Sequence, residues 1–318
     1  MAGRAWLGQI AALAVGTAAH AEDAPLPFTL KPLGNGVYAA IDAGGKAGSN
    51  AGSNAGFVVG DDGVAVIDAF FTPEAARTLL GEIRKVTPLP VKYVINTHYH
   101  LDHTGGDGVF HEAGATIIAH RNVRAWLKAD NPHLFGDRIT PAIHAQIEAL
   151  PEPDLTTTQT LTLWLGKRRV DVAAYPGHTG GDLVVSVPDA HVRFCGDLLW
   201  RKFAPNIIDG TVPAWIATVK GFEAAPDAVA TRFVPGHGDV AELKDVAEFE
   251  GYLENLTAWT KAGLKRGLKD KSLVDEVLPK LKARYPDWAS IDRLGLRGIG
   301  YMEAGLEGTK PIPVPPKD

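Results

Sequence analysis

The chain has 318 residues, of which 45% are hydrophobic and 22% charged, which is ample for one large globular core. The formal net charge of -5 gives no excess of basic residues for a nucleic-acid partner. Beyond the N-terminus, no run of apolar residues is long enough to predict a membrane span in the mature chain.

The N-terminus has the layout of an export signal. Arg4 precedes a largely apolar run, Trp6 to Ala19, and Ala19-His20-Ala21 is a small-x-small cleavage site. We therefore predict that residues 1–21 are a signal peptide and that the mature protein is periplasmic or secreted. A buried or amphipathic first helix is the alternative. Cys195 is the only cysteine, so no internal disulfide can form.

The first half of the mature chain alternates predicted strands with predicted helices, which favours an α/β protein whose helices cover sheets. Gly48–Ala51 is echoed by Gly52–Ala55, and this repeat predicts a flexible glycine-rich loop. The predicted strands are Val37–Ile41, Phe57–Val59, Val64–Asp68, Val91–Asn96 and Ala115–Ala119, and the predicted helices are Pro73–Lys85 and Arg121–Ala129.

A second set of strands begins near residue 160, after an insertion at residues 130–150 that contains a predicted helix, Pro141–Leu150. The two halves together predict a sheet-on-sheet core flanked by helices. From Val240 onward the pattern is helical, and the proline-rich end, Pro311–Pro316, is expected to be disordered. The predicted elements are strands Thr160–Leu165, Val170–Ala174, Leu183–Val187, Val192–Cys195 and Arg232–Val234, and helices Val212–Phe222, Leu243–Leu268 and Ser272–Ala283.

Ligand-type side chains concentrate directly after the strand that ends at Asn96. The segment reads His98-x-His100-x-Asp102-His103. Alternate residues of an extended segment project the same way, so His98 and His100 can share one metal ion. Asp102 and His103, where the chain turns into glycines, can address a second. A solvated histidine-rich loop is the alternative, but ligand-type residues recur downstream.

Four other strand ends carry ligand-type residues: Asp68, His178, Asp197 and His237. A glycine precedes each of the last three. Glycine lets the backbone turn sharply and approach a metal closely. Together with the histidine-rich segment, these strand ends predict a metal centre.

The motifs, taken in this order, resemble those of the metallo-β-lactamase superfamily over roughly residues 33–245. The resemblance implies an αββα four-layer sandwich with the site at one edge between two sheets. Residues 22–245 would form this hydrolase domain, and residues 246–318 a C-terminal helical extension with a proline-rich tail.

The same resemblance implies a ligand set. Asp68 would orient a ligand imidazole through a hydrogen bond. Nitrogen and oxygen ligands alone fit two Zn²⁺ best, with Fe or Mn as alternatives. By this resemblance the first ion is held by His98, His100 and His178, the second by Asp102, His103 and His237, and Asp197 bridges both.

The implied activity is that of an exported binuclear hydrolase. Two cations that share a water lower its pKa toward neutrality, and the resulting hydroxide would attack an acyl carbonyl. Asp102 would be the catalytic residue that holds the proton of the nucleophile. The substrate would be a small molecule with an ester, thioester, lactone or β-lactam bond, which the sequence does not rank. The sequence leaves the oligomeric state open.

Asp197 distinguishes branches of the family. An aspartate here is similar to the thioesterase and lactonase branches of the glyoxalase II type, whereas true β-lactamases of the superfamily carry cysteine or serine. Trp200 stands where some relatives carry a substrate-binding lysine or tyrosine. The predicted export argues against the cytosolic glutathione thioester of glyoxalase II itself.

Substrate contacts are expected from residues near Asp197. Arg201 and Lys202 either bind an anionic group or form a solvated surface pair. The candidate pocket walls, with core packing as the alternative, are Phe70, Phe71, Trp200 and Phe203. The histidines outside strand ends are expected on the surface or in helix packing, although His133 lies in the insertion that could overhang the site; they are His111, His120, His133, His144 and His191.

Three other functions stay open: a β-lactamase proper, an iron oxidoreductase and a non-catalytic exported metal-binding protein. Persulfide dioxygenases resemble the chain in the first motif but use one iron. The complete second set, His103 with His237, favours two metals and therefore hydrolysis.

Overall fold

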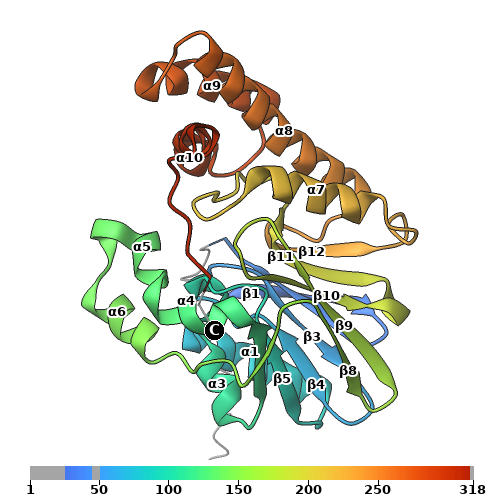
Figure 1. Ribbon diagram of the computed structural model, residues 1–318. Coiled ribbons are helices and arrows are strands. Elements are labelled where there is room, and N and C mark those ends of the chain that lie inside the picture. Colours follow the sequence, from blue (N-terminus) through green and yellow to red (C-terminus); the bar gives the residue numbers. More distant parts are fainter. Residues whose placement is uncertain (1–25, 45–50, 316–318) are drawn as a thin grey trace, which may run out of the picture.

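The computed structural model describes residues 26–44 and 51–315 (Figure 1). The predicted signal peptide lies outside these residues, as do part of the predicted glycine-rich loop and the last residues of the proline-rich end. Among the described helices, none combines the length and the apolarity that crossing a membrane requires.

The first sheet has seven strands that lie side by side in chain order. Neighbouring strands from β1 to β4 run antiparallel, and β5, β6 and β7 continue the sheet in parallel with β4. The bounds are β1 Phe28–Gly34, β2 Val37–Asp42, β3 Ala55–Val59, β4 Val64–Ile67, β5 Val91–Ile95, β6 Thr116–His120 and β7 Leu155–Thr157.

The second sheet has five strands in the order β12-β11-β10-β9-β8. All its neighbours are antiparallel except β11 and β12, which the crossover helix α7 (Val212–Glu223) connects in parallel. The bounds are β8 Thr160–Leu165, β9 Arg168–Tyr175, β10 Asp182–Val187, β11 Val192–Trp200 and β12 Arg232–His237.

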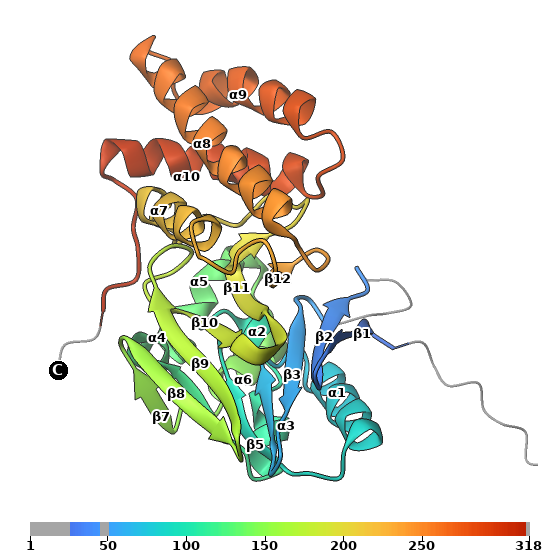
Figure 2. The same cartoon turned by 90° about the vertical axis from the view of Figure 1, so that its right-hand side faces the viewer.

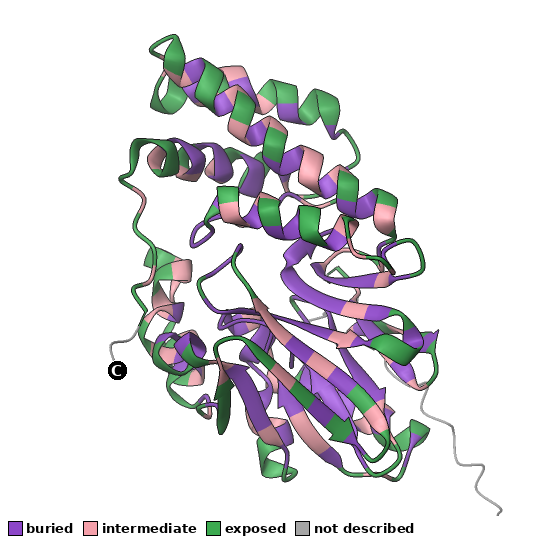
Figure 3. Ribbon diagram, turned by 45° about the vertical axis from the view of Figure 1, so that its right-hand side comes forward, coloured by how far each residue is buried: buried purple, intermediate pink, exposed green. Residues whose placement is uncertain are grey.

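The two sheets face each other across one hydrophobic layer, and helices cover their outer faces. In β4, Ala65 and Ile67 point toward the second sheet, whereas Val64 and Val66 pack under helix α1 (Pro73–Val86). This is the alternation that a strand imposes on successive side chains. Both faces of the strand are buried (Figure 3), which is why the sequence reads as an unbroken apolar run. The predicted αββα sandwich is confirmed.

Shorter helices cover the edge of the first sheet and form the insertion before β7. Helices α4, α5 and α6 share a small hydrophobic cluster with Tyr99 and Leu101. The bounds are α2 Leu101–Thr104, α3 Asp107–Glu112, α4 Arg121–Ala129, α5 Asn131–Phe135 and α6 Pro141–Glu148, with short 3₁₀ turns at Gly136–Arg138 and Pro188–Ala190.

The C-terminal helices stack on the end of the molecule where β11 and β12 lie (Figure 2). They are α8 (Leu243–Lys265), α9 (Asp270–Arg284) and α10 (Leu296–Glu307), with one π-helical turn at Ile291–Gly295 before α10. The helical extension that the sequence predicts is therefore present. The expected domain boundary at residues 245 and 246 falls inside the first turn of α8.

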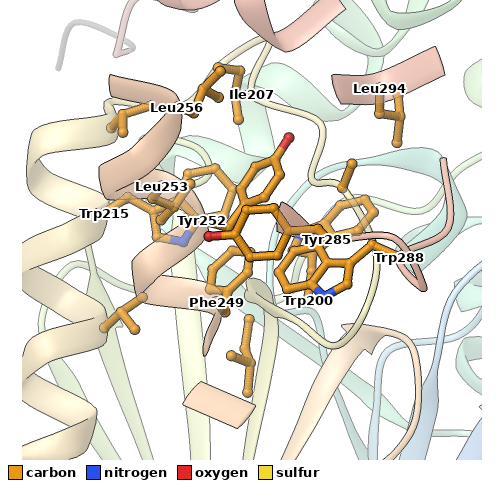
Figure 4. Close-up of a cluster of buried hydrophobic side chains, with 14 of the residues drawn as sticks. Trp200, Ile207, Trp215, Phe249, Tyr252, Leu253, Leu256, Tyr285, Trp288 and Leu294 are labelled. Atoms are coloured by element: carbon orange, nitrogen blue, oxygen red, sulfur yellow. The ribbon is translucent and has the colours of Figure 1, made fainter. Parts of the chain in front are cut away.

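An aromatic cluster joins these helices to the second sheet (Figure 4). Trp200 of β11 and Trp215 of α7 share this cluster with Phe249 and Tyr252 of α8. Trp288 stacks on Tyr252, with ring centroids 5.0 Å apart and planes at 15°. Because one continuous core includes both parts, the helices are held firmly beside the strand ends.

Two expectations about loops are wrong for the residues that the structure describes. Ser53 and Asn54 are buried, not flexible: the Ser53 hydroxyl donates to the Asp102 carbonyl at 2.6 Å. The described part of the proline-rich end is also anchored, since Trp126 Nε1 donates to the carbonyl of Val314 at 2.9 Å. Lys310 Nζ donates to the carbonyls of Ile207 and Gly210. Specific hydrogen bonds therefore hold the described parts of both segments in place despite their glycine- and proline-rich composition.

Candidate metal centre

The ligand-type residues that follow separate strands meet at one edge of the two sheets. The segment from His98 to His103 follows β5 and enters α2, and His178 lies between β9 and β10. Asp197 lies within β11, and His237 ends β12. Residues that are 139 positions apart in sequence thus become neighbours because parallel strands end at the same edge.

The first group contains His98, His100, His178 and Asp197, all buried. Their ligand atoms lie within 4.8 Å of one another. Nδ1 of His100 is 3.1 Å from Nε2 of His178, which in turn is 3.2 Å from Oδ2 of Asp197. Nε2 of His98 lies 3.8 Å from the same carboxylate oxygen. This is the set that the sequence assigns to a first ion.

The second group contains Asp102, His103 and His237, again with ligand atoms within 4.8 Å of one another. Nε2 of His237 lies 3.4 Å from Oδ2 of Asp102. The other carboxylate oxygen of Asp197, Oδ1, is 3.1 Å from Nε2 of His103 and 3.4 Å from Nε2 of His237. Asp197 therefore presents one oxygen to each group, which is the geometry a bridging carboxylate needs.

Asp68 fixes the orientation of His103. Its backbone adopts a positive φ of 57° directly after β4, and its Oδ2 lies 2.8 Å from Nδ1 of His103. Thr97 donates to the same carboxylate from its backbone nitrogen at 2.7 Å and from its hydroxyl at 2.8 Å. With Nδ1 engaged, Nε2 of His103 is the atom left to face Asp197.

Asp209 orients His100 in the way that Asp68 orients His103. Sequence analysis did not identify Asp209 as a residue of the site. Its Oδ2 lies 3.0 Å from Nε2 of His100 and accepts the Tyr99 hydroxyl at 2.6 Å. Its Oδ1 lies 3.0 Å from Nε2 of His133. Burial raises the pKa of Asp209, but hydrogen bonds from His100, His133 and Tyr99 outweigh it and hold the pKa well below its usual range.

Two glycines allow the strands to approach closely enough to form the centre. A Cβ on Gly236 would lie 1.8 Å from Oδ1 of Asp197. Gly196 has a φ of 49°, and a Cβ there would lie 2.3 Å from Oγ1 of Thr97. A side chain at Gly236 would displace Asp197, and one at Gly196 would displace Thr97, which donates to Asp68.

The donor atoms fit a pair of metal ions. In the described part of the chain, four buried atoms that point into the centre make no hydrogen bond: Nε2 of His98, His103 and His237, and Oδ1 of Asp197. Buried polar atoms normally have partners, and four such atoms facing one another could serve as ligands to metal ions. Three histidines and one carboxylate at the first position, and two histidines and two carboxylates at the second, match the ligand types that zinc takes in catalytic sites.

The pKa shifts differ between the two groups. Burial lowers the pKa of His98 well below its usual range and that of His178 to about 3, so both imidazoles are neutral. Burial also lowers the pKa of His103 and that of His237, but the carboxylates of Asp197 and Asp102 outweigh this effect. They raise the pKa of His103 well above its usual range and the pKa of His237 to about 9. A metal ion at the second group would replace this positive charge beside the same carboxylates.

A cavity of about 310 Å³ opens onto the centre. Asp102, which is 31% exposed, lies in its wall together with His237. Trp200 stacks on the imidazole of His237, with ring centroids 4.0 Å apart and planes at 24°, and so holds that ring in place. Aromatic and cationic side chains complete the wall: Phe71, Phe135, Trp200, Phe203, Arg138, Arg293 and Arg297.

The structure corrects three of the four expected substrate contacts. Trp200 lines the cavity, but Phe70 is fully buried and stacks on Phe28 at 5.2 Å. Arg201 donates to the Val240 carbonyl at 2.7 Å, and its Nε lies 3.2 Å from Asp245. Lys202 pairs with Asp287 at the surface. The side chains of Arg201 and Lys202 point away from the cavity because β11 ends at Trp200 and the chain turns outward there.

The histidines outside the strand ends lie mostly as expected. Nδ1 of His120 caps α4 by accepting the backbone nitrogen of Asn122 at 3.2 Å, and His111 lies 3.7 Å from Asp154. His133 is different, because its contact with Asp209 links the insertion to His100. The helical insertion thus reaches the surroundings of the first group.

The sequence is similar to those of known proteins. A sequence profile described as "Metallo-beta-lactamase superfamily" matches residues 49–243. The hydroxyacylglutathione hydrolase of Albidiferax ferrireducens is 28% identical over 214 residues, which cover 65% of this chain and 72% of that protein. The alpha subunit of 2,4-dinitroanisole O-demethylase from Nocardioides sp. is 30% identical over 161 residues, 47% of this chain and less than half of that subunit, 46%.

The fold has solved counterparts as well. The structure of a metallo-beta-lactamase from Pontibacter korlensis matches with a TM-score of 0.58 at 21% identity. The match covers 72% of this chain and 99% of that one. At this identity the likeness concerns the fold alone.

Proposed function

The chain belongs to the metallo-beta-lactamase superfamily, and from that premise we propose that it is an exported hydrolase of small acyl substrates with two metal ions. The observation that carries the proposal is the position of Asp197. Its two carboxylate oxygens face two separate sets of ligand atoms, and each set is complete enough to hold one ion. A one-iron oxidoreductase would not need the second set.

The residues that would hold the metals are those of the two groups. His98, His100 and His178 would hold the first ion, and Asp102, His103 and His237 the second, with Asp197 between them. When bound, two Zn²⁺ ions, or Fe or Mn in their place, supply Lewis-acid activation of a water molecule and of the acyl carbonyl. Asp68 and Asp209 hold His103 and His100 in the orientations that ligation requires.

Asp102 is the residue placed to move a proton. Burial raises its pKa, but His103 and His237 outweigh this and keep the pKa below its usual range, so the carboxylate is ionised at neutral pH. Oδ2 of Asp102 can therefore accept the proton of the attacking water and later donate it to the leaving group. Its exposure in the cavity wall leaves room for a substrate beside it.

Hydrolysis of an acyl bond agrees with the composition of the cavity. Carboxylates and imidazoles lie at its inner end and aromatic rings at its sides. One relative is named for hydrolysis of a hydroxyacylglutathione, a thioester, so thioesters are the first class to test, before lactones, esters and β-lactams. The apolar N-terminal run with its small-x-small site supports export.

The proposal is tested by assaying the mature chain from Glu22 against a thioester, a lactone, an aryl ester and a β-lactam. The expected result is turnover of at least one class that a chelator abolishes and added zinc restores. 2,4-Dinitroanisole, which the name of another relative suggests, serves as the non-acyl substrate. Turnover of that ether alone would overturn acyl hydrolysis. Metal binding without any turnover would favour the binding-protein alternative.

Asp209→Asn should weaken zinc binding at the first group by about 10- to 100-fold. The amide removes the charge that orients His100 and replaces one acceptor oxygen with a donor. Competition with a zinc-chelating dye measures the effect. Asp137→Asn is the matched control, since Asp137 is exposed and does not line the cavity. Unchanged zinc affinity in Asp209→Asn would remove the orienting role.

A further inference from the structure

Three arginines from distant parts of the chain line the cavity beside the candidate metal centre. Arg138 ends the 3₁₀ turn of the insertion, Arg293 lies in the π-helical turn, and Arg297 lies in the first turns of α10. The insertion and the C-terminal helices therefore approach the same cavity with the same type of charge.

None of these three arginines has a carboxylate partner within the described residues. Nη2 of Arg297 donates to the Tyr301 hydroxyl at 3.0 Å, and its guanidinium lies 5.7 Å from the centroid of that ring. Arg293 makes one long hydrogen bond, 3.5 Å, to the Ser290 hydroxyl. Several arginines elsewhere pair with acids, as Arg193 does with Asp227 at 2.6 Å.

The carboxylates in the cavity wall do not supply the missing partners. Only Asp102 and Asp197 are acidic among the residues that line it, and both belong to the ligand groups of the candidate metal centre. Three guanidinium groups around one cavity repel one another unless an anion lies between them. The cavity is therefore complementary to a negatively charged molecule.

The segment that carries two of the arginines is anchored to the hydrophobic core. Leu294, between Arg293 and Arg297, is buried in the aromatic cluster that joins the C-terminal helices to the second sheet (Figure 4). Arg293 and Arg297 are four residues apart and so lie on the same side of a helical segment. The buried Leu294 thus places both arginines beside the cavity, where neither has a partner acid within the described residues.

We propose that Arg138, Arg293 and Arg297 recognise an anionic part of the substrate that carries two negative charges, such as two carboxylates. A guanidinium binds a carboxylate through two parallel hydrogen bonds, and three guanidinium groups exceed what one carboxylate can use. The aromatic wall formed by Phe71, Phe135 and Phe203 would contact the apolar part. The inference rests on the proposed hydrolase function, because it treats this cavity as the substrate site.

A matched series of aryl esters tests the inference on the metal-loaded enzyme: phenyl acetate, 3-acetoxybenzoate and 5-acetoxyisophthalate carry no, one and two carboxylates. The expected kcat/KM rises by about 10-fold with each carboxylate, mainly through KM. Arg293→Gln and Arg297→Gln should each raise KM for the dianionic ester by about 10-fold or more and change that for phenyl acetate less than about 2-fold. Added salt should reduce the preference.

Arg84→Gln is the matched control, because Arg84 is an exposed arginine of α1 that does not line the cavity. This variant should keep the preference for the dianionic ester. Equal kcat/KM for all three esters in the wild-type enzyme would overturn the inference and leave the hydrolase function intact.

Binding of the product 5-hydroxyisophthalate, followed by calorimetry, separates the inference from the hydrolase proposal. Wild-type protein and Arg84→Gln should bind it, and the double variant Arg293→Gln/Arg297→Gln should bind at least about 10-fold more weakly. If no ester is hydrolysed but this pattern holds, the hydrolase proposal fails and the recognition site stands. Equal binding of 5-hydroxyisophthalate by all three proteins would overturn the inference of an arginine recognition site, since its carboxylates would then bind only at the metals.

Discussion

Asp102→Ala is expected to lower kcat by about 10²- to 10⁴-fold in a protein that remains folded. The substitution removes the only carboxylate of the second group that reaches into the cavity, and with it the acceptor for the proton of the attacking water. Steady-state kinetics on whichever acyl class the wild-type enzyme prefers measures the loss. A variant that keeps most of its kcat would remove Asp102 from the reaction.

Two further measurements separate loss of chemistry from loss of structure. The far-ultraviolet circular dichroism of Asp102→Ala should equal that of the wild type, because the Asp102 side chain is 31% exposed and is not part of a hydrophobic core. Asp102→Glu is the conservative variant. It should recover part of the activity, since a carboxylate is restored at a slightly different position.

Asp197→Ala is expected to weaken the binding of both metal ions, by at least about 100-fold each. Its Oδ2 lies 3.2 Å from His178, and its Oδ1 lies 3.1 Å from His103, so one substitution removes a ligand from both groups. It also leaves several imidazoles facing one another without their charge partner. Elemental analysis after dialysis should find close to no metal, and an activity assay should find no turnover.

His237→Ala is the matched comparison for Asp197→Ala. His237 belongs only to the second group, so its loss should reduce the metal content by about one ion and leave the first group filled. If both variants lose the same number of ions, Asp197 does not bridge the two groups. If His237→Ala still binds two ions, His237 is not a ligand.

Several of the strands that the sequence predicted are buried on both faces, although β8 and β9, which alternate between buried and more exposed residues, were predicted as well. β4 and β5 read as apolar runs because helices cover one side and the second sheet the other. β7 was missed, since two of its three residues are exposed and nothing in its pattern distinguishes it from a loop. α10 was missed because Gly298, Gly300 and Gly305 interrupt it, and glycine is a poor helix former.

The residues of the candidate metal centre could be predicted from the sequence more completely than the other residues of the site. Most of its residues lie at the end of a strand or shortly after one, so the alternation of apolar runs with histidine and aspartate places them at one edge. Asp209 lies in an irregular segment after β11, and only the apolar Ile207 and Ile208 before it and Gly210 after it hint at a turn toward the core.

The cationic wall of the cavity could not be predicted for a different reason. Arg138 belongs to the insertion and Arg297 to a helix that the sequence did not reveal, and only tertiary packing brings the two to the same cavity. The sequence pointed instead to Arg201 and Lys202 because they adjoin Asp197. Proximity along the chain was misleading, since alternate and turning residues leave a strand end in opposite directions.

The number and identity of metal ions in the purified wild-type chain test the central claim most directly. Native mass spectrometry combined with elemental analysis gives both values on the protein from which activity is measured. The account predicts two ions per chain, zinc above all, and loss of turnover when they are removed. One iron per chain would contradict the binuclear hydrolase and favour the oxidoreductase alternative.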